Sequence, residues 1–104
     1  IIIYERMIEM VKKYNNNENF DEIIKNRVLV DFYADWCGPC RMLGPVLEKI
    51  DGIDIIKVNV DESGELARKY GVMSIPCVIL FEDSKEIKRN VGFMNEEKVR
   101  DFLK

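Results

Sequence analysis

The segment VLVDFYADWCGPCRML, residues 28–43, decides the fold, because it runs from a buried strand into a helix through a pair of cysteines. Residues 27–33 are an apolar, β-branched run long enough for a strand covered on both faces, interrupted only by Asp31. Over residues 37–50 the apolar side chains recur at helical spacing, and Pro45 is predicted to kink that helix. A charge inside a buried strand costs stability, so Asp31 suggests a function.

The rest of the chain alternates in the same way between helical and extended patterns. Strands separated by helices imply parallel pairing, whereas a closing hairpin is antiparallel. The patterns therefore predict a mixed sheet with helices on both faces. The expected elements are a short helix over 20–24, a strand over 53–60, a helix between 61 and 71, strands over 77–81 and 87–91 joined by a turn at 82–85, and a final helix capped by Asn95; a strand over 10–14 stays open.

Length and charge limit what the chain can be. With 104 residues it has room for one domain, which we expect at 10–104, after an N-terminal extension of unknown role at 1–9. The 16 basic and 19 acidic residues form no long block of one sign, which argues against a nucleic-acid partner. No apolar run approaches the ~20 residues that cross a bilayer, which predicts a soluble chain without a membrane span. Because the chain opens without methionine, we expect that something upstream was removed or is missing. The cytoplasm is the expected location, with an organelle or secretion as alternatives.

The numbers of cysteine and histidine residues limit the kinds of catalytic and metal-binding site that the chain can form. Three cysteines are too few for a disulfide scaffold, so a redox or metal role for some of them is more plausible. Histidine is absent, which excludes Ser/His and Cys/His catalysis and any metal site built on imidazole. Half of a zinc site at Cys37 and Cys40 is a weak alternative, because four ligands are usual and only Cys77 remains. We expect no metal.

Cys37 and Cys40 are close enough in sequence to form and break a small disulfide ring. Cys37 falls at the predicted helix N-terminus, where free N–H groups and the helix dipole favour a thiolate, so it should attack first. Cys40 lies one turn further in and would resolve the mixed disulfide. Gly38 permits the tight turn and Pro39 presets a helical φ. Neither adds a positive charge, so the pair should donate electrons and act as a reductase.

The segments DFYADWCGPCRMLGPVLEKI, KVNVDE, YGVMSIPCVILF and VGF together resemble the thioredoxin family, over about residues 10–104. The resemblance implies an α/β thioredoxin fold, with a central mixed sheet of four to five strands flanked by about four helices. It implies a monomeric protein-disulfide reductase whose only redox group is the Cys37–Cys40 disulfide, with no bound cofactor. A flavin- and NADPH-dependent thioredoxin reductase would supply the electrons, and proteins carrying disulfides would be its clients.

The resemblance also assigns roles to residues outside the cysteine pair. Asp31 would lie beneath Cys40 and take its proton, helped by a pKa that burial raises. Lys57 would pair with that carboxylate; a merely structural ion pair is the alternative. Ile75 and Pro76 would form a cis peptide that faces Cys37 and binds an extended substrate segment like an added strand. Substrate would contact a shallow apolar groove formed by Trp36, Gly38, Pro39, Ile75, Pro76, Gly92 and Phe93, although Trp36 could instead be an ordinary core aromatic.

The sequence departs from the family pattern at Cys77, where threonine is usual. Cys77 is either a regulatory thiol near the active pair or a small apolar filler at the start of a strand, and we favour the filler. A different class of function is a noncatalytic binding subunit of a larger complex that docks through Trp36 and Pro76. The intact cysteine pair argues against it, because docking needs neither two thiols nor a buried base.

Overall fold

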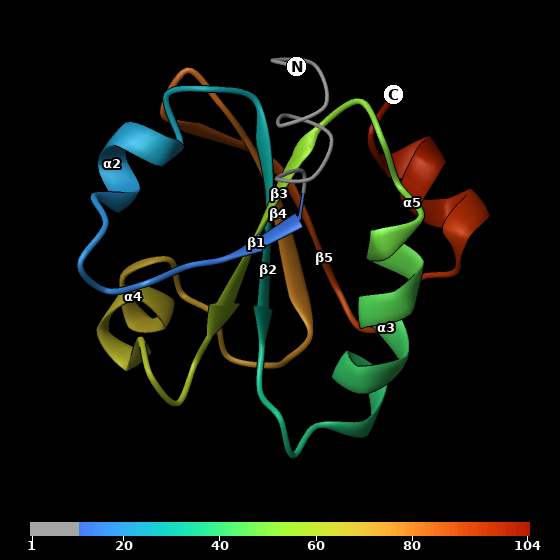
Figure 1. Cartoon of the computed structure of the whole chain (residues 1–104), viewed down its shortest axis with the longest axis horizontal. Coiled ribbons are helices and arrows are strands. Elements are labelled where there is room, and N and C mark those ends of the chain that lie inside the picture. The colour runs from blue at the N-terminus through green and yellow to red at the C-terminus, as the bar shows by residue number, and fades with distance from the viewer. Residues whose placement is uncertain (1–10) are drawn as a thin grey trace, which may run out of the picture.

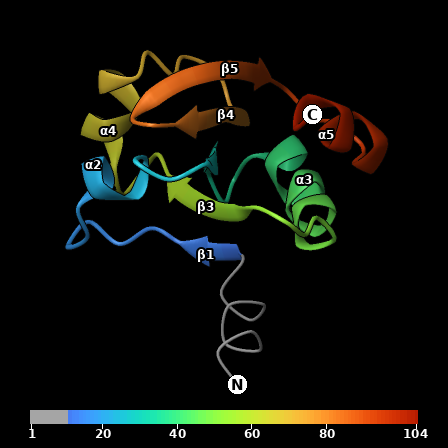
Figure 2. The same ribbon diagram turned by 90° about the horizontal axis from the view of Figure 1, so that it is seen from above.

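A computed structural model of the chain describes residues 11–104, which form a five-stranded mixed sheet with helices on both faces (Figures 1 and 2). The expected extension at 1–9 and Met10 lie outside these residues. The strand order is β1-β3-β2-β4-β5; β1, β3 and β2 pair in parallel, and β4 and β5 complete the sheet antiparallel. The strands are β1 (Val11–Lys13), β2 (Val28–Tyr33), β3 (Asp54–Asn59), β4 (Cys77–Glu82) and β5 (Lys85–Val91).

Within residues 11–104, two helices cover each face of the sheet. In Figure 1, α2 and α4 lie on one side, and α3 and α5 lie on the other. Asn19 and Asn95 cap α2 and α5 by accepting hydrogen bonds from backbone N–H groups of the first turn, which satisfies donors that have no partner inside the helix. This arrangement confirms the predicted fold. The helices are α2 (Phe20–Ile23), α3 (Gly38–Glu48), α4 (Gly64–Lys69) and α5 (Glu96–Phe102).

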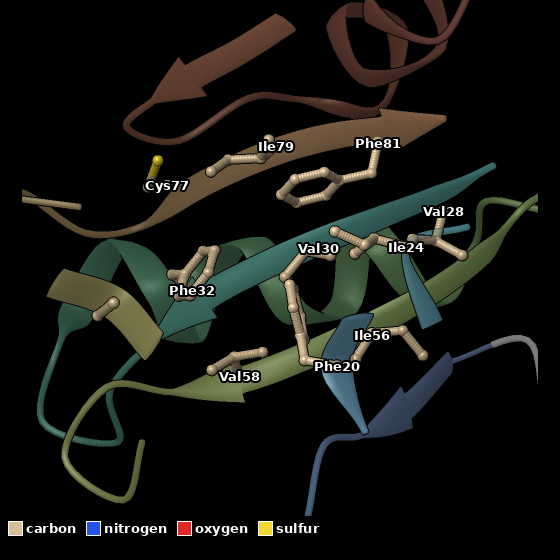
Figure 3. Close-up of a cluster of buried hydrophobic side chains, with 11 residues drawn as sticks. Phe20, Ile24, Val28, Val30, Phe32, Ile56, Val58, Cys77, Ile79 and Phe81 are labelled. Carbon is tan, nitrogen blue, oxygen red and sulfur yellow. The ribbon is translucent and has the colours of Figure 1, made fainter. Parts of the chain in front are cut away.

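The central strand β2 is buried on both faces, as its apolar sequence predicts. Side chains of a strand alternate between faces, so β2 contributes to two separate cores. One core lies against α2 and α4 and is shown in Figure 3; it includes Val30, Phe32 and Cys77. The other lies against α3 and α5 and includes Leu29 and Leu43. Asp31 therefore points toward the α3 side, in the face that also holds Leu29.

Two local features differ from, or add detail to, the sequence prediction. The hairpin turn is shorter than residues 82–85, because Asp83 and Ser84 both adopt positive φ and β5 begins at once at Lys85. Positive φ at both central residues matches the right-handed twist of the flanking strands. Pro45 lies inside α3, and the helix continues past it to Glu48.

Candidate active site

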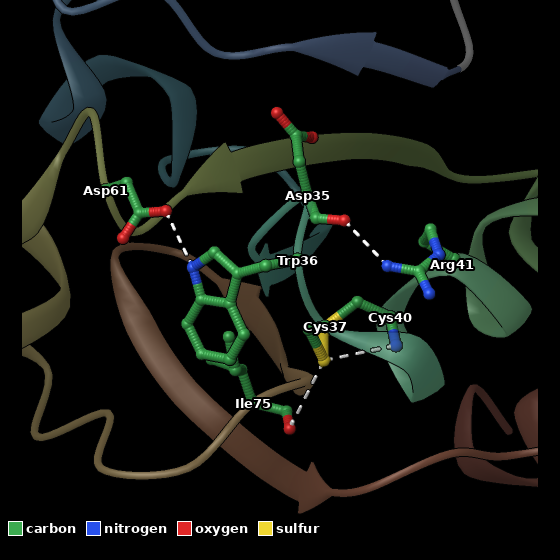
Figure 4. The surroundings of a disulfide bond; sticks show 7 residues. All are labelled: Asp35, Trp36, Cys37, Cys40, Arg41, Asp61 and Ile75. Carbon is green, nitrogen blue, oxygen red and sulfur yellow. Dashed lines mark hydrogen bonds between the residues drawn. A yellow bond between two sulfur atoms is a disulfide. The ribbon is translucent and has the colours of Figure 1, made fainter.

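The cysteine pair sits at the junction between the loop after β2 and the first turn of α3. Cys37 is the N-cap of α3, and Cys37 and Cys40 form a disulfide with Cα atoms 5.2 Å apart. The backbone N–H of Cys40 points at Cys37 Sγ across 3.3 Å (Figure 4). The same donor and the positive end of the helix dipole would stabilise a Cys37 thiolate once the disulfide is reduced. A reduced Cys37 would therefore sit where a thiolate is favoured, as the predicted role of attacking sulfur requires.

A shallow groove of about 590 Å³ opens in front of Cys37. Four of the predicted substrate-contacting residues line it, from both sides of the cysteine: Trp36, Gly38, Pro39 and Ile75. Sequence reasoning missed its other walls, because they come from the segment before the cis-proline and from the end of β3. These are Val60, Val72, Met73 and Ser74. Met73 is 95 % exposed, so this wall of the groove presents an apolar side chain to solvent.

The Ile75–Pro76 segment lies directly across from the nucleophile. The peptide is cis, as predicted, and the carbonyl oxygen of Ile75 lies 3.8 Å from Cys37 Sγ (Figure 4). Pro76, Gly92 and Phe93 do not line the groove. The backbone N–H of Gly92 donates to the Pro76 carbonyl across 2.8 Å, which places Gly92 beside the cis-proline, and Phe93 is 42 % exposed.

Trp36 is held in an exposed position by a bond that the sequence did not reveal. Its side chain is 68 % exposed, and its indole N–H donates to Asp61 Oδ2 across 2.9 Å (Figure 4). Asp61 looks like a helix cap in the sequence, and nothing in its spacing indicates the contact with an aromatic residue 25 positions earlier. On the other side of the loop, the Arg41 guanidinium donates to the Asp35 carbonyl. Two side-chain hydrogen bonds thus fix the loop that carries Cys37, one made by Trp36 and one made to Asp35.

Asp31 is completely buried, and neither of its carboxylate oxygens has a hydrogen-bond partner among the described residues. Loss of hydration raises the pKa of its carboxyl from 3.8 to about 6, and the positive charge of Lys57 opposes this rise. At pH 7 most of this carboxyl is therefore ionised, yet it binds a proton far more readily than an exposed aspartate. These are the properties of a general base in the core.

Lys57 does not form the direct pair with Asp31 that the resemblance implies. The two residues are neighbours in register on β3 and β2, so they share a face, but the carboxylate oxygens accept no bond from the ammonium. Lys57 Nζ instead lies 4.5 Å from the centroid of the Tyr33 ring. Both Lys57 and Cys40 line a second groove, of about 660 Å³, between α3 and the sheet. Cys37 does not line this groove.

Cys77 is a buried core residue at the start of β4, directly after the cis-proline. Its side chain belongs to the core on the α2 and α4 face, where it pairs in register with Phe32, and only 1 % of it is exposed. Burial raises the pKa of the Cys77 thiol, and the nearby Arg89 guanidinium opposes the rise. These surroundings match the interpretation of Cys77 as a small apolar side chain that fills the core at the start of a strand. Within residues 11–104 no group of three or more Cys, Asp or Glu side chains is arranged to hold a metal ion.

Comparison with known proteins gives a consistent match. The family model described as Thioredoxin matches residues 11–104. A thioredoxin from Staphylococcus haemolyticus is 46 % identical over 93 residues, covering 84 % of this chain and 89 % of the relative, and one from Chlamydia trachomatis is 45 % identical over 96 residues, covering 88 % and 90 %. The solved structure of a mutant thioredoxin from Halobacterium salinarum superposes with a TM-score of 0.81 at 37 % identity, covering 91 % of this chain and 88 % of that one. Among the described residues, no helix has the length and apolarity needed to cross a membrane.

Proposed function

Because the chain belongs to the thioredoxin family, and is a thiol-disulfide oxidoreductase with the active-site disulfide Cys37–Cys40, we propose a division of roles within the site. Cys37 attacks the client disulfide, Cys40 resolves the mixed disulfide, and Asp31 takes up the proton that Cys40 must lose. The observation that carries this proposal is the buried, unpartnered Asp31 carboxyl on the sheet face that lies under α3.

In the first step the Cys37 thiolate attacks one sulfur of a client disulfide. A bond forms between Cys37 Sγ and that sulfur, the client disulfide breaks, and the second client sulfur leaves as a thiolate. The client segment lies in the groove along Ile75, whose backbone binds it as an added strand. Trp36 and Pro39 provide an apolar wall beside the reacting sulfur, which suits many client sequences.

In the second step Cys40 releases the client. The Cys40 thiol gives its proton to the Asp31 carboxylate, directly or through water, and the resulting thiolate attacks Cys37 Sγ. The Cys37–Cys40 disulfide forms, the mixed disulfide breaks, and the client leaves with both sulfurs reduced. Two electrons have moved from the cysteine pair to the client, so the redox group is the disulfide itself and no bound cofactor takes part.

The oxidised pair must then be reduced again by a partner. We infer a thioredoxin reductase that uses flavin and NADPH as the electron source, and protein clients with accessible disulfides as the acceptors. We place the reaction in the cytoplasm, where thiols are kept reduced, and the chain acts as a monomer. Lys57 contributes by moderating the charge of Asp31 at a distance rather than by pairing with it.

The test follows dithiothreitol-driven reduction of insulin disulfides and covalent capture of clients. We expect Cys37→Ser to abolish the acceleration, and Cys40→Ser to accumulate mixed disulfides that a reducing gel releases. Cys77→Ala is the matched control, since this buried thiol lies outside both grooves, and it should keep the activity and trap nothing. Full activity of Cys37→Ser, or no trapped species with Cys40→Ser, would contradict the assignment and would favour a docking role.

A further inference from the structure

The arrangement around Lys57 is not explained by a simple ion pair with Asp31. Lys57 lies opposite Asp31 on the neighbouring strand, the position from which it could reach the carboxylate directly. Its ammonium nevertheless sits 4.5 Å from the centroid of the Tyr33 ring, while both Asp31 oxygens lack a hydrogen-bond partner within residues 11–104. Tyr33 is two residues after Asp31 on β2, so it stands on the same face of the sheet.

An ammonium within about 6 Å of an aromatic face is attracted by the ring, and the attraction grows as the site loses water. Tyr33 is only partly exposed and borders the groove between α3 and the sheet. Gly44 of α3 lies close to the ammonium, since a Cβ built there would stand at an ordinary contact distance of 3.5 Å from Lys57 Nζ. Tyr33 and Asp31 therefore compete for one cation, and in this structure the ring holds it.

We propose that Tyr33 is a positioning residue for the reaction: its ring holds the Lys57 ammonium off the Asp31 carboxylate and so keeps that carboxylate basic enough to accept the proton of Cys40. The proposal rests on the role given above to Asp31. A direct ion pair would stabilise the ionised carboxylate and make it a weaker base. Without Lys57, the buried charge would be left with no compensation.

Other charges near this pair do not replace Lys57. Lys13, its register neighbour on β1, is ion-paired with Glu62 at 3.1 Å. On the β4 side the register neighbour of Asp31 is the uncharged Val78. Among the described residues, burial raises the pKa of the Asp31 carboxyl and the charge of Lys57 lowers it. Of these two influences, the one that a side-chain movement can change is the distance from the Lys57 ammonium to the carboxylate. The remaining titratable groups around the pair are Asp35, Arg41, Glu48 and Lys49 along the second groove and Cys77 across the sheet; Cys40 joins them only when the disulfide is reduced.

The test titrates the Asp31 carboxyl by its ¹³C chemical shift in the oxidised protein. Tyr33→Leu removes the ring and should lower the titration midpoint by at least about half a pH unit, because the ammonium is free to approach the carboxylate. Tyr33→Phe is the matched control: it keeps the ring, loses only the hydroxyl, and should leave the midpoint within about 0.2 of a unit. If Tyr33→Leu does not fold, Tyr33→Met supplies the same comparison.

A second pair of variants, built on Lys57→Met, distinguishes an effect of Tyr33 on the position of the ammonium from an effect of Tyr33 on packing. In Lys57→Met there is no ammonium to hold, so adding Tyr33→Leu should no longer move the midpoint. Looser packing that admits water would lower the midpoint in that background as well, and this result would overturn the proposal. An unchanged midpoint in Tyr33→Leu would overturn it too.

The pH profile of mixed-disulfide resolution distinguishes this proposal from the one on which it rests. Its acid limb should move together with the carboxyl midpoint in Tyr33→Leu. If the midpoint moves and the rate profile does not, Tyr33 still controls Lys57, and the role of Asp31 as proton acceptor is wrong.

Discussion

Replacing Asp31 with asparagine should stabilise the oxidised protein at neutral and alkaline pH, although it removes the proposed base. Burial raises the pKa of this carboxyl from 3.8 to about 6, so the folded protein keeps its proton over a range in which the unfolded chain has lost it. Over that range the unfolded state binds fewer protons, and the free energy of unfolding falls as the pH rises. Once both states are ionised, the difference amounts to about 3 kcal/mol, at about 1.4 kcal/mol per pKa unit.

Asparagine has nearly the same shape and no charge, so its substitution removes this cost. Urea unfolding of the oxidised wild type and Asp31→Asn should give similar free energies at about pH 4 and below, a difference that grows up to about pH 6, and a constant difference of about 3 kcal/mol above about pH 7. Asp54→Asn, at an exposed position on β3, controls for the loss of one negative charge elsewhere on the molecule. A difference below about 1 kcal/mol at pH 8, or one of equal size at pH 4, would refute the reasoning.

The same variant should be slower at releasing clients. If Asp31 accepts the Cys40 proton, resolution of the mixed disulfide should slow by about 10²-fold or more in Asp31→Asn. Attack by Cys37 should change much less, because its sulfur is stabilised by the Cys40 N–H and the helix N-terminus rather than by the carboxyl. A more stable protein with a selectively slower second step is the expected pair of results.

Three further predictions concern positions outside the reacting groups. Gly44→Ala should raise the unfolding free energy by up to about 1 kcal/mol, since an interior helical glycine is replaced and the new methyl makes ordinary contact; a lower urea midpoint would contradict this. Asn95→Ala should lower it by about 1 kcal/mol, because the cap bond to the Lys98 N–H at 2.9 Å is lost. Cys77, buried and with a raised pKa, should resist iodoacetamide until guanidinium unfolds the chain, and rapid labelling of the native protein would favour the regulatory interpretation.

The sequence predicted the elements well because each has a strong local pattern. The apolar run of β2, the helical spacing after Cys37 and the capping Asn95 depend on neighbours in the chain, and the structure places all three as expected. Strand alternation together with the register of β4 on β2 puts Cys77 and Asp31 on opposite faces of the sheet, because Cys77 pairs with Phe32 and Asp31 pairs with Val78. That separation was available from the sequence only once the register of β4 against β2 was known.

The contacts that the sequence could not give depend on long side chains and on loops. Lys57 can place its ammonium anywhere within reach of several rotatable bonds, so its strand position does not decide between the Asp31 carboxylate and the Tyr33 ring. The bond from Trp36 to Asp61 joins two loops whose relative placement follows from the packing of the whole sheet. The resemblance to the thioredoxin family predicted which residues belong to the site. Which of them touch each other follows only from the three-dimensional structure.

The two cysteines open onto different grooves, and this separation has a consequence for the order of events. Cys37 lines the groove beside Ile75, Cys40 lines the groove beside Lys57, and the two grooves share no lining residue within 11–104. A client bound along Ile75 covers the first groove and leaves the second open to water. If Asp31 has the proposed role, the proton of Cys40 can pass to it while the client is still attached to Cys37, because Cys40 borders the groove that the client leaves open. Resolution then needs no prior movement of the client, because the attacking sulfur approaches from the side that the client does not occupy.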